Sequence, residues 1–362
     1  MQPELADARR VLVARLDNLG DVVLTGPFAR AVRAAAPDAR LSLLASPGGA
    51  QAAPLLPWYD EVIVRRAVWQ DIGGQLGFDP ARELDFVECL RVGRWDAAFV
   101  LTSFSQTSYA AGYAAYLAGI PVRVGHAPDF GGSVLSHPIA PPPDGSHQAE
   151  RNLHLLDELD VPVHDRDLSV VVPADDRAWA DAALRARDIH DAPFVAIVPG
   201  ASCAARRWPA ERYGAAARVL SAAGLPVVVL GSEREGSEAD SIIAASSAAV
   251  SLVGRTSIGQ LAAVVERAAV VLCGNSLALH LADALRRPVV ALYSGTERES
   301  EWGPRATAAR LLRIPTACAP CRRFTCPFDL ACLDLDPTTV ATRVLELAGT
   351  AAPEGRCVAF AS

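Results

Sequence analysis

Residues 11–21 read VLVARLDNLGD, a short apolar run that passes directly into a polar, turn-forming segment. The run Val11–Leu16 predicts a buried strand and Asp17–Asp21 a loop, and apolar residues then recur at helical spacing to about Ala36. A strand, a tight loop and an amphipathic helix are the repeating unit of a parallel sheet covered by helices. The stretch therefore predicts an α/β fold.

The same alternation continues along the chain, with one interruption. A proline-rich loop at 140–145 precedes a helix expected at 148–158, and a linker is expected between that helix and Pro173. Strands and helices then alternate again, so two doubly wound parallel sheets are expected. The predicted domains are 1–170 and 171–335, followed by a last helix and tail at 336–362 that we expect to pack back toward the N-terminal domain. Expected strands are 11–16, 41–45, 61–64, 97–101, 194–198, 227–230, 270–272 and 289–293, and expected helices of the second half are 211–222, 235–246, 258–267 and 278–285.

Composition supports two domains and excludes several classes of function. A chain of 362 residues is longer than one hydrophobic core usually serves. The net charge of −7 argues against nucleic acid as a partner, because phosphate contacts need clustered basic residues. All 34 basic residues are arginine, which excludes a lysine Schiff base and a P-loop lysine.

The N-terminal residues show no secretory signal pattern, and no apolar stretch approaches the ~20 residues of a membrane helix. We therefore expect a cytoplasmic protein whose contact with a membrane, if any, is peripheral.

The loop after the first strand offers one acid for chemistry. Gly20 allows a tight turn, and Asp21 lies at or near the start of the next helix. Its carboxylate can point toward a ligand at the edge of the sheet, or it can simply cap the helix. The spacing alone leaves both interpretations open.

The first loop of the second half, residues 198–209, combines a glycine, a hydroxyl and paired arginines between a strand and a helix. Backbone N–H groups and Ser202 can hold phosphate oxygens while Arg206 pairs with their charge. Ordinary surface arginines in a connecting loop explain the same pattern.

Two later loops carry further polar candidates. Glu235 follows the next strand. A carboxylate there can accept hydrogen bonds from ribose hydroxyls, or it can simply stabilise the N-terminus of a helix through the helix dipole. Asn275 and Ser276 begin a helix, where both side chains can donate to phosphate or act as plain caps. His280, four residues after Ser276, fits a packed core position equally well.

Taken in order, four motifs resemble glycosyltransferase family 9, whose best-known members are the ADP-heptose lipopolysaccharide heptosyltransferases. The motifs are Leu19–Val22, His147–Leu153, Pro199–Ser202 with Arg207–Pro209, and Asn275–Ala282. The resemblance covers roughly residues 10–347. It implies a GT-B fold of two Rossmann-like domains facing across a cleft, with the nucleotide-sugar donor bound by the C-terminal half and the acceptor by the N-terminal half.

Residue by residue, the resemblance also implies roles. Asp21 matches the catalytic base, Ser202 and Ser276 match phosphate contacts, Arg206 matches a basic residue that is often lysine, and Glu235 matches the ribose-binding acid. The segment Asn275-Ser276-Leu277 departs from the Asp-Ser/Thr-Gly of many heptosyltransferases, which bears on donor identity.

The function expected from the resemblance is an inverting glycosyltransferase. It would move a sugar, heptose from ADP-heptose being the first choice, onto a lipopolysaccharide-core-like or other cell-surface glycan. No cofactor is required, and a lipid-linked acceptor would bring peripheral membrane contact. A GT-B nucleotide-sugar epimerase and a non-catalytic nucleotide-sugar-binding protein are the alternatives.

Four cysteines lie close together near the end of the second domain, at Cys318, Cys321, Cys326 and Cys332. Structural thiols or disulfides, a structural zinc site and a redox-active site all remain open, although the spacing is shorter than that of a zinc ribbon. The acids of Asp334-Leu335-Asp336 precede a proline and the last helix, so they are predicted to cap it.

Overall fold

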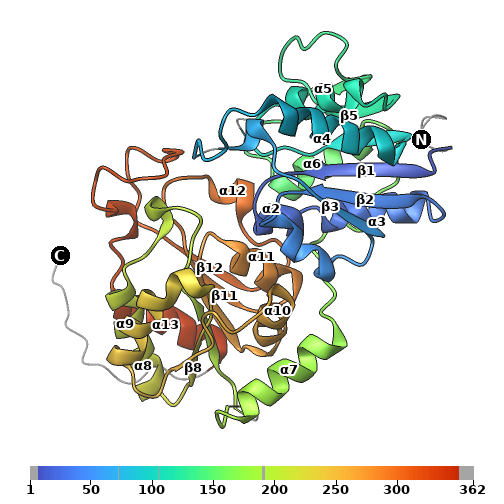
Figure 1. The fold of residues 1–362 in the computed structure, drawn as a ribbon. Helices are drawn as coiled ribbons and strands as arrows, with labels where there is room; N and C mark the ends of the chain where they lie inside the picture. The colour runs from blue at the N-terminus through green and yellow to red at the C-terminus, as the bar shows by residue number, and fades with distance from the viewer. Residues whose placement is uncertain (1–6, 72, 105, 190–191, 350–362) are drawn as a thin grey trace. The chain divides into compact units, whose positions relative to one another are not determined.

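The computed structural model describes residues 7–71, 73–104, 106–189 and 192–349 (Figure 1). They form two compact units, with the change of unit between Pro173 and Ala174. The short segment Ser300–Trp302 is grouped with the first unit, and the chain from Gly303 onward with the second. The boundary predicted from the sequence lies after residue 170, and the tail predicted after the last helix lies outside the described residues.

The N-terminal unit contains one six-stranded sheet in the order β3-β2-β1-β4-β5-β6, and every neighbouring pair is parallel. Side chains of β1 alternate between its two faces, as a pleated strand requires. Val11 and Val13 join one hydrophobic cluster with Phe28 of α3, whereas Leu12 joins another with Phe86 of α4. Helices therefore cover both faces of the sheet. The elements are β1 Arg10–Arg15, α2 Leu19–Val23, α3 Gly26–Ala35, β2 Arg40–Ala45, β3 Glu61–Val64, α4 Pro80–Gly93, β4 Ala97–Val100, α5 Tyr109–Leu117, β5 Val122–His126, β6 His137–Ile139 and α6 Gln148–Asp157, with short 3₁₀ helices at Gly49–Leu55 and Val68–Gln70.

The helix expected to run from the first loop to about Ala36 is divided into α2 and α3. Thr25 is the N-cap of α3, and Pro27 lies in the first turn of that helix. Proline has no N–H to donate to the preceding turn, so a helix that already includes Asp21 cannot continue through it. The prediction of a single helix was wrong, and the break leaves Asp21 on a helix of only five residues.

The C-terminal unit repeats this architecture with strand order β12-β11-β10-β7-β8-β9, again with every pair parallel. Numbered from its own first strand, its order is the same as that of the N-terminal unit. The two doubly wound parallel sheets predicted from sequence are thus confirmed. The elements are α7 Ala174–Arg185, β7 Val195–Val198, α8 Ala210–Ala222, β8 Val227–Val229, α9 Gly236–Ala245, β9 Val250–Ser251, α10 Ile258–Arg267, β10 Val270–Gly274, α11 Leu277–Ala284, β11 Val289–Leu292, β12 Ala309–Leu312 and α13 Pro337–Ala348, with 3₁₀ turns at Ala204–Arg206, Glu233–Glu235 and Ala331–Leu333. Between β11 and β12 lies the short helix α12 Glu299–Trp302, whose last three residues are grouped with the first unit.

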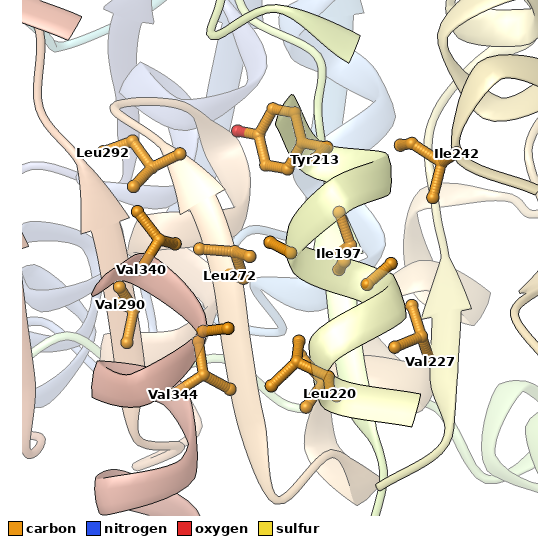
Figure 2. Close-up of a cluster of buried hydrophobic side chains, with 14 of the residues drawn as sticks. Ile197, Tyr213, Leu220, Val227, Ile242, Leu272, Val290, Leu292, Val340 and Val344 are labelled. Carbon is orange, nitrogen blue, oxygen red and sulfur yellow. The ribbon is translucent and has the colours of Figure 1, made fainter. Parts of the chain in front are cut away.

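The last helix, α13, packs against α8, β10, β11 and β12 of the C-terminal unit. Its buried face, which includes Val340 and Val344, meets Tyr213 and Leu220 of α8 above β10 and β11 (Figure 2). Four apolar residues of α13 are fully buried there, namely Val340, Ala341, Val344 and Leu345. At its N-terminus Asp336 accepts the N–H of Thr339 at 2.8 Å, which confirms the predicted cap.

No helix in the described part of the chain is both long enough and apolar enough to cross a membrane.

In each sheet the strand order reverses between the first and fourth strands of the unit, at β1/β4 and at β7/β10. Open parallel sheets bind ligands at the carboxyl ends of their strands, beside this reversal. The loops that follow β1, β4, β7 and β10 are therefore the places where functional side chains are expected.

Candidate active site

A buried arginine organises the reversal point of the N-terminal sheet. Arg15 is the last residue of β1, and its side chain is fully buried. Its Nε lies 2.9 Å from Oδ2 of Asp17, and its Nη2 lies 2.8 Å from Oδ1 of Asp21. A buried charge is tolerated when it is paired, so one arginine holds both acids of the loop in place.

Asp21 also caps its own short helix. Its Oδ2 accepts the backbone N–H of Asn18 at 3.1 Å, as one half of a capping box at the start of α2. The capping interpretation considered from sequence is thus correct for this oxygen, while Oδ1 is oriented by Arg15. The side chain keeps 12% of its surface exposed, so the carboxylate is fixed in direction and still reaches the surface of the unit.

Ser103 and Gln106, in the loop after β4, complete this cluster, and neither was predicted from the sequence. Ser103 Oγ lies 2.5 Å from Arg15 Nη2 and donates to Asp21 Oδ1 at 3.3 Å. Gln106 Nε2 donates to Asp17 Oδ1 at 2.7 Å. Their only signal in the sequence is that they are polar and follow an apolar strand.

The pKa of Asp17 reflects this setting. Burial raises the pKa of Asp17 above its usual value, the charge of Arg15 opposes that rise, and the nearby charge of Asp21 adds to it. Asp17 therefore serves as the inner, buried partner of Arg15, and Asp21 is the outer one.

The motif at 147–153 fixes the structure around this cluster. Gln148 Nε2 donates to the carbonyl of Thr102, next to Ser103, at 3.0 Å. Asn152 Nδ2 donates to the carbonyl of Leu24, next to α2, at 3.0 Å. The start of α6 is thus tied to the end of β4 and to the end of α2, which sets the relative positions of Ser103 and Asp21.

In the C-terminal unit, Arg206 lies at the end of a 3₁₀ turn after β7 and contacts three other residues. Its Nε donates to Thr296 Oγ1 at 3.1 Å, and its Nη1 donates to Ser202 Oγ at 3.3 Å. Its Nη2 lies 2.5 Å from Oε1 of Glu297. The structure thus brings Ser202 and Arg206 together, and adds two residues from the loop after β11 that the sequence analysis missed.

Asn275 and Ser276 follow β10, directly beside the reversal of strand order. Asn275 is buried, and its Nδ2 donates to Oε2 of Glu297 at 2.6 Å, which links it to Arg206. Ser276 occupies the N-cap position of α11 but makes no capping hydrogen bond, and its buried Oγ has no hydrogen-bond partner. The hydroxyl of Ser276 is therefore available to bind a polar group at the start of α11. His280 is buried in α11, as a core position requires.

Glu235 is held in a cradle made by two glycines. Its Oε2 accepts the N–H and the Oγ–H of Ser232 at 2.9 and 2.7 Å, in a capping box before α9. A Cβ added to Gly200 would lie 2.9 Å from its Cδ and 3.0 Å from its Oε1, and one added to Gly231 would lie 3.3 Å from its Oε2. The carboxylate of Glu235 therefore packs directly against the loop that carries Ser202.

The four cysteines lie beside the loops that carry Arg206 and Thr296. They are free thiols that line one small cavity together with Gly295 and Thr296. In the described ranges no three His, Cys, Asp or Glu side chains are arranged to hold a metal ion, so these thiols do not fit the structural zinc considered from sequence. Backbone bonds join their segment to its neighbours, from Cys321 N to Gly295 O and from Ala205 N to Phe324 O. They hold the loops of Thr296 and Arg206 in position.

Sequence relatives agree on one family. Residues 85–331 match glycosyltransferase family 9 (heptosyltransferase). Lipopolysaccharide heptosyltransferase 2 of Salmonella typhimurium is 27% identical over 320 residues, which cover 85% of this chain and 88% of that protein. Its Escherichia coli counterpart is 26% identical over the same coverage.

Solved structures agree on the fold. A family 9 glycosyl transferase from Veillonella parvula superposes with a TM-score of 0.76 at 20% identity, over 94% of this chain and 97% of that one. The E. coli ADP-heptose lipopolysaccharide heptosyltransferase II gives a TM-score of 0.72 at 22% identity, over 94% and 98%. An E. coli heptosyltransferase solved with ADP-2-deoxy-2-fluoro heptose gives 0.63 at 20% identity, over 84% and 93%. The fold is thus GT-B, and because the family match spans more than half of its length, the chain belongs to glycosyltransferase family 9.

Proposed function

We propose that this glycosyltransferase moves a heptosyl group from ADP-heptose onto a hydroxyl of a lipopolysaccharide-core-like or other cell-surface glycan, with inversion at the anomeric carbon. The observation that carries the proposal is the unpartnered, buried hydroxyl of Ser276 at the N-terminus of α11, beside the β7/β10 reversal. A helix N-terminus with an unsatisfied hydroxyl attracts a phosphate group. The two lipopolysaccharide heptosyltransferase relatives favour heptose as the sugar.

In this proposal the donor binds to the C-terminal unit. The diphosphate is held by Ser276, by Ser202 and by the guanidinium of Arg206, which offers a planar fork of donors. Asn275 lies beside Arg206 through the shared Glu297. The ribose hydroxyls donate to the carboxylate of Glu235, whose Oε1 lies against Gly200.

Asp21 is the catalytic base of the proposed reaction. A hydroxyl oxygen of the acceptor attacks the anomeric carbon while the bond from that carbon to the β-phosphate oxygen breaks, and the hydroxyl proton passes to Asp21. Arg15 and Ser103 orient one oxygen of the carboxylate, and the Asn18 N–H orients the other. Such a base typically contributes about 10²–10⁴-fold.

The departing ADP gains negative charge in the transition state. In the proposed reaction Arg206 and the hydroxyls of Ser202 and Ser276, with the N-terminus of α11, stabilise that charge more strongly than the charge of the bound donor. The contact of Arg206 with Ser202 and the N-cap position of Ser276 support this role. Because the expected acceptor is lipid-linked, contact with a membrane would be peripheral.

The test is transfer by the purified chain from ADP-heptose to core oligosaccharides truncated at successive sugars, with the product followed by mass and its anomeric configuration by NMR. Asp21→Asn should lower turnover at saturating substrate by about 10²–10⁴-fold and leave ADP affinity unchanged. The matched control is Asp38→Asn at an exposed acid of the same unit, which should behave like the wild type.

Near-native turnover of Asp21→Asn would contradict the assignment of the base. Isomerisation of the donor without acceptor would favour an epimerase instead, and donor binding without any turnover would favour a binding protein.

A further inference from the structure

Four cysteines of the C-terminal unit form a cluster that the proposed function does not use. Cys318, Cys321, Cys326 and Cys332 are free thiols, and all four line one cavity of about 20 Å³. Such a volume has room for about one water molecule, so the four residues lie close together. Cys318 is exposed, so reagents in solution can reach this member of the cluster.

The four thiols are not equivalent. Sγ of Cys332 accepts the N–H of Gly295 at 3.2 Å, and this cysteine is buried. Sγ of Cys326 accepts the N–H of Phe328 at 3.4 Å. Cys318 and Cys321, in contrast, are separated by two residues, which is the spacing of the redox-active motif of thiol–disulfide oxidoreductases. An accessible thiol and a neighbour at this spacing make these two the pair that can react together.

The backbone beside this pair is bonded to the loop of the proposed donor site. The N–H of Cys321 donates to the carbonyl of Gly295 at 2.9 Å, and the N–H of Arg322 donates to the carbonyl of Thr296 at 3.0 Å. Thr296 Oγ1 in turn accepts the Nε–H of Arg206 at 3.1 Å. A displacement at Cys321 is therefore passed through Thr296 to the guanidinium that is assigned to the diphosphate.

We propose that Cys318 and Cys321 form a reversible disulfide that weakens donor binding. A disulfide needs sulfur atoms about 2.05 Å apart and Cβ atoms about 3.8 Å apart. Because the two thiols are unbonded here, closing the bond draws them together and strains the hydrogen bond from Cys321 to Gly295. The effect on ADP rests on the donor site argued above, whereas the formation of the disulfide does not.

The oxidant in this proposal is a small-molecule disulfide such as oxidised glutathione. The thiolate of Cys318 attacks one of its sulfur atoms, which breaks the glutathione S–S bond and releases one glutathione thiolate. The thiolate of Cys321 then attacks the Cys318 sulfur and releases the second glutathione. The two cysteine protons end on the two glutathione thiols, and two electrons pass from the cysteines to the oxidant. Excess reduced glutathione reverses both steps.

The first measurement is the covalent state of the full chain after incubation with oxidised or reduced glutathione, alkylation and digestion with trypsin. Cleavage after Arg313 and Arg322 releases peptide 314–322, which contains Cys318, Cys321 and no other cysteine. In the oxidised wild type this peptide should be lighter by two hydrogens than the peptide with free thiols, and it should resist alkylation. In Cys321→Ser it should instead retain one glutathione on Cys318, because the second thiol is absent.

The second measurement is calorimetric titration with ADP after glutathione has been removed. The oxidised wild type should bind ADP about tenfold more weakly than the reduced wild type, and reduction should restore the affinity. The double variant Cys318→Ser/Cys321→Ser should have the same Kd after either treatment. Cys326→Ser is the matched control, because it removes a thiol from the same cavity and leaves the pair intact. It should respond to oxidation as the wild type does.

Free thiols at both cysteines of peptide 314–322 after oxidation would overturn the proposal. So would ADP binding that is unchanged or tighter in the oxidised wild type, or a loss in the double variant as large as that in the wild type. A reduced wild type that binds no ADP would instead refute the proposed donor site, and the mass of peptide 314–322 would still decide whether the disulfide forms.

Discussion

Gly200→Ala is a one-methyl change that should displace Glu235, the acid assigned to the ribose. The new Cβ would lie 2.9–3.0 Å from Cδ, Cγ and Oε1 of Glu235, closer than such atoms approach in proteins. The backbone of Gly200 is not left-handed, so the clash is the only perturbation. Glu235 cannot simply swing away, because it is 91% buried and tied to Ser232 by two hydrogen bonds.

Two costs follow from this geometry. Overpacking of this kind destabilises a protein by about 1–3 kcal/mol, and losing the capping bonds to Ser232 adds about 1 kcal/mol. For the ligand, a hydrogen bond from a ribose hydroxyl to an ionised acid is worth about 1.5–3 kcal/mol, which corresponds to roughly 10–100-fold in affinity. A carboxylate moved by a few tenths of an ångström or more loses much of that bond.

The assay compares ADP with its 2′-deoxy and 3′-deoxy analogues by calorimetry. The wild type should bind ADP about tenfold or more tightly than the analogue that lacks the hydroxyl bound by Glu235, whereas Gly200→Ala should bind the two about equally. Gly236→Ala is the control, because nothing lies within 4 Å of a Cβ at this helical position. It should keep the discrimination, with a stability gain of up to about 1 kcal/mol.

The reasoning would be refuted by a Gly200→Ala chain that still separates ADP from the deoxy analogues as the wild type does. Glu235 would be shown not to bind ribose if the wild type bound ADP and both deoxy analogues equally and Gly200→Ala lost the same affinity for all three nucleotides.

Three further predictions concern other parts of the molecule. Ser103→Ala removes a hydroxyl that links Arg15 to Asp21, so steady-state kinetics should show kcat lowered by about tenfold and ADP affinity unchanged; a normal kcat would contradict the role of Ser103. Burial, followed by the charges of Arg151 and His154, lowers the pKa of His126 to about 3. The unfolded chain therefore binds a proton at His126 at a higher pH than the folded chain does, so the stability that neutral His126 contributes is complete above pH ~6.5. It is lost as the pH falls toward 3, by up to about 1.4 kcal/mol per pH unit. Hydrogen exchange of β5 should show this loss between pH 6.5 and 5 in the wild type and a flatter profile in His126→Gln. Asp336→Ala should cost about 1 kcal/mol in thermal unfolding, because it removes the N-cap of α13, and an unchanged transition would rule the cap out as a stabilising contact.

The fold class could be predicted from the sequence because many of the strands and helices are specified locally. Val11–Leu16 identifies a buried strand by itself, and helix α10 begins and ends where the periodicity indicated. The division of α2 from α3 could also have been predicted from the sequence, since Pro27 fits only the first turn of a helix. The elements that α13 packs against could not be predicted, because an apolar stripe shows that one face of a helix is covered but does not show which element covers it.

The candidate site could be predicted only in part, for a related reason. Asp21 and Arg15 are six residues apart, and a glycine turn marks their loop. Ser103 is 88 residues from Arg15, and Glu297 is 91 residues from Arg206, and nothing in their own neighbourhoods distinguishes them from ordinary loop residues. What brings them together is the strand order, which places the ends of β4 and β11 near those of β1 and β10.

This dependence on strand order also explains why Asn275 was misleading when considered alone. Within its own loop the amide departs from the acid of the motif that it resembles, and this departure was related to donor identity. In the sheet, β10 lies between β7 and β11, so its loop can share side-chain contacts with both neighbours. Glu297, from the loop after β11, contacts both Asn275 of the loop after β10 and Arg206 of the loop after β7. Substitutions in such a loop therefore have to be interpreted together with the loops that follow the neighbouring strands.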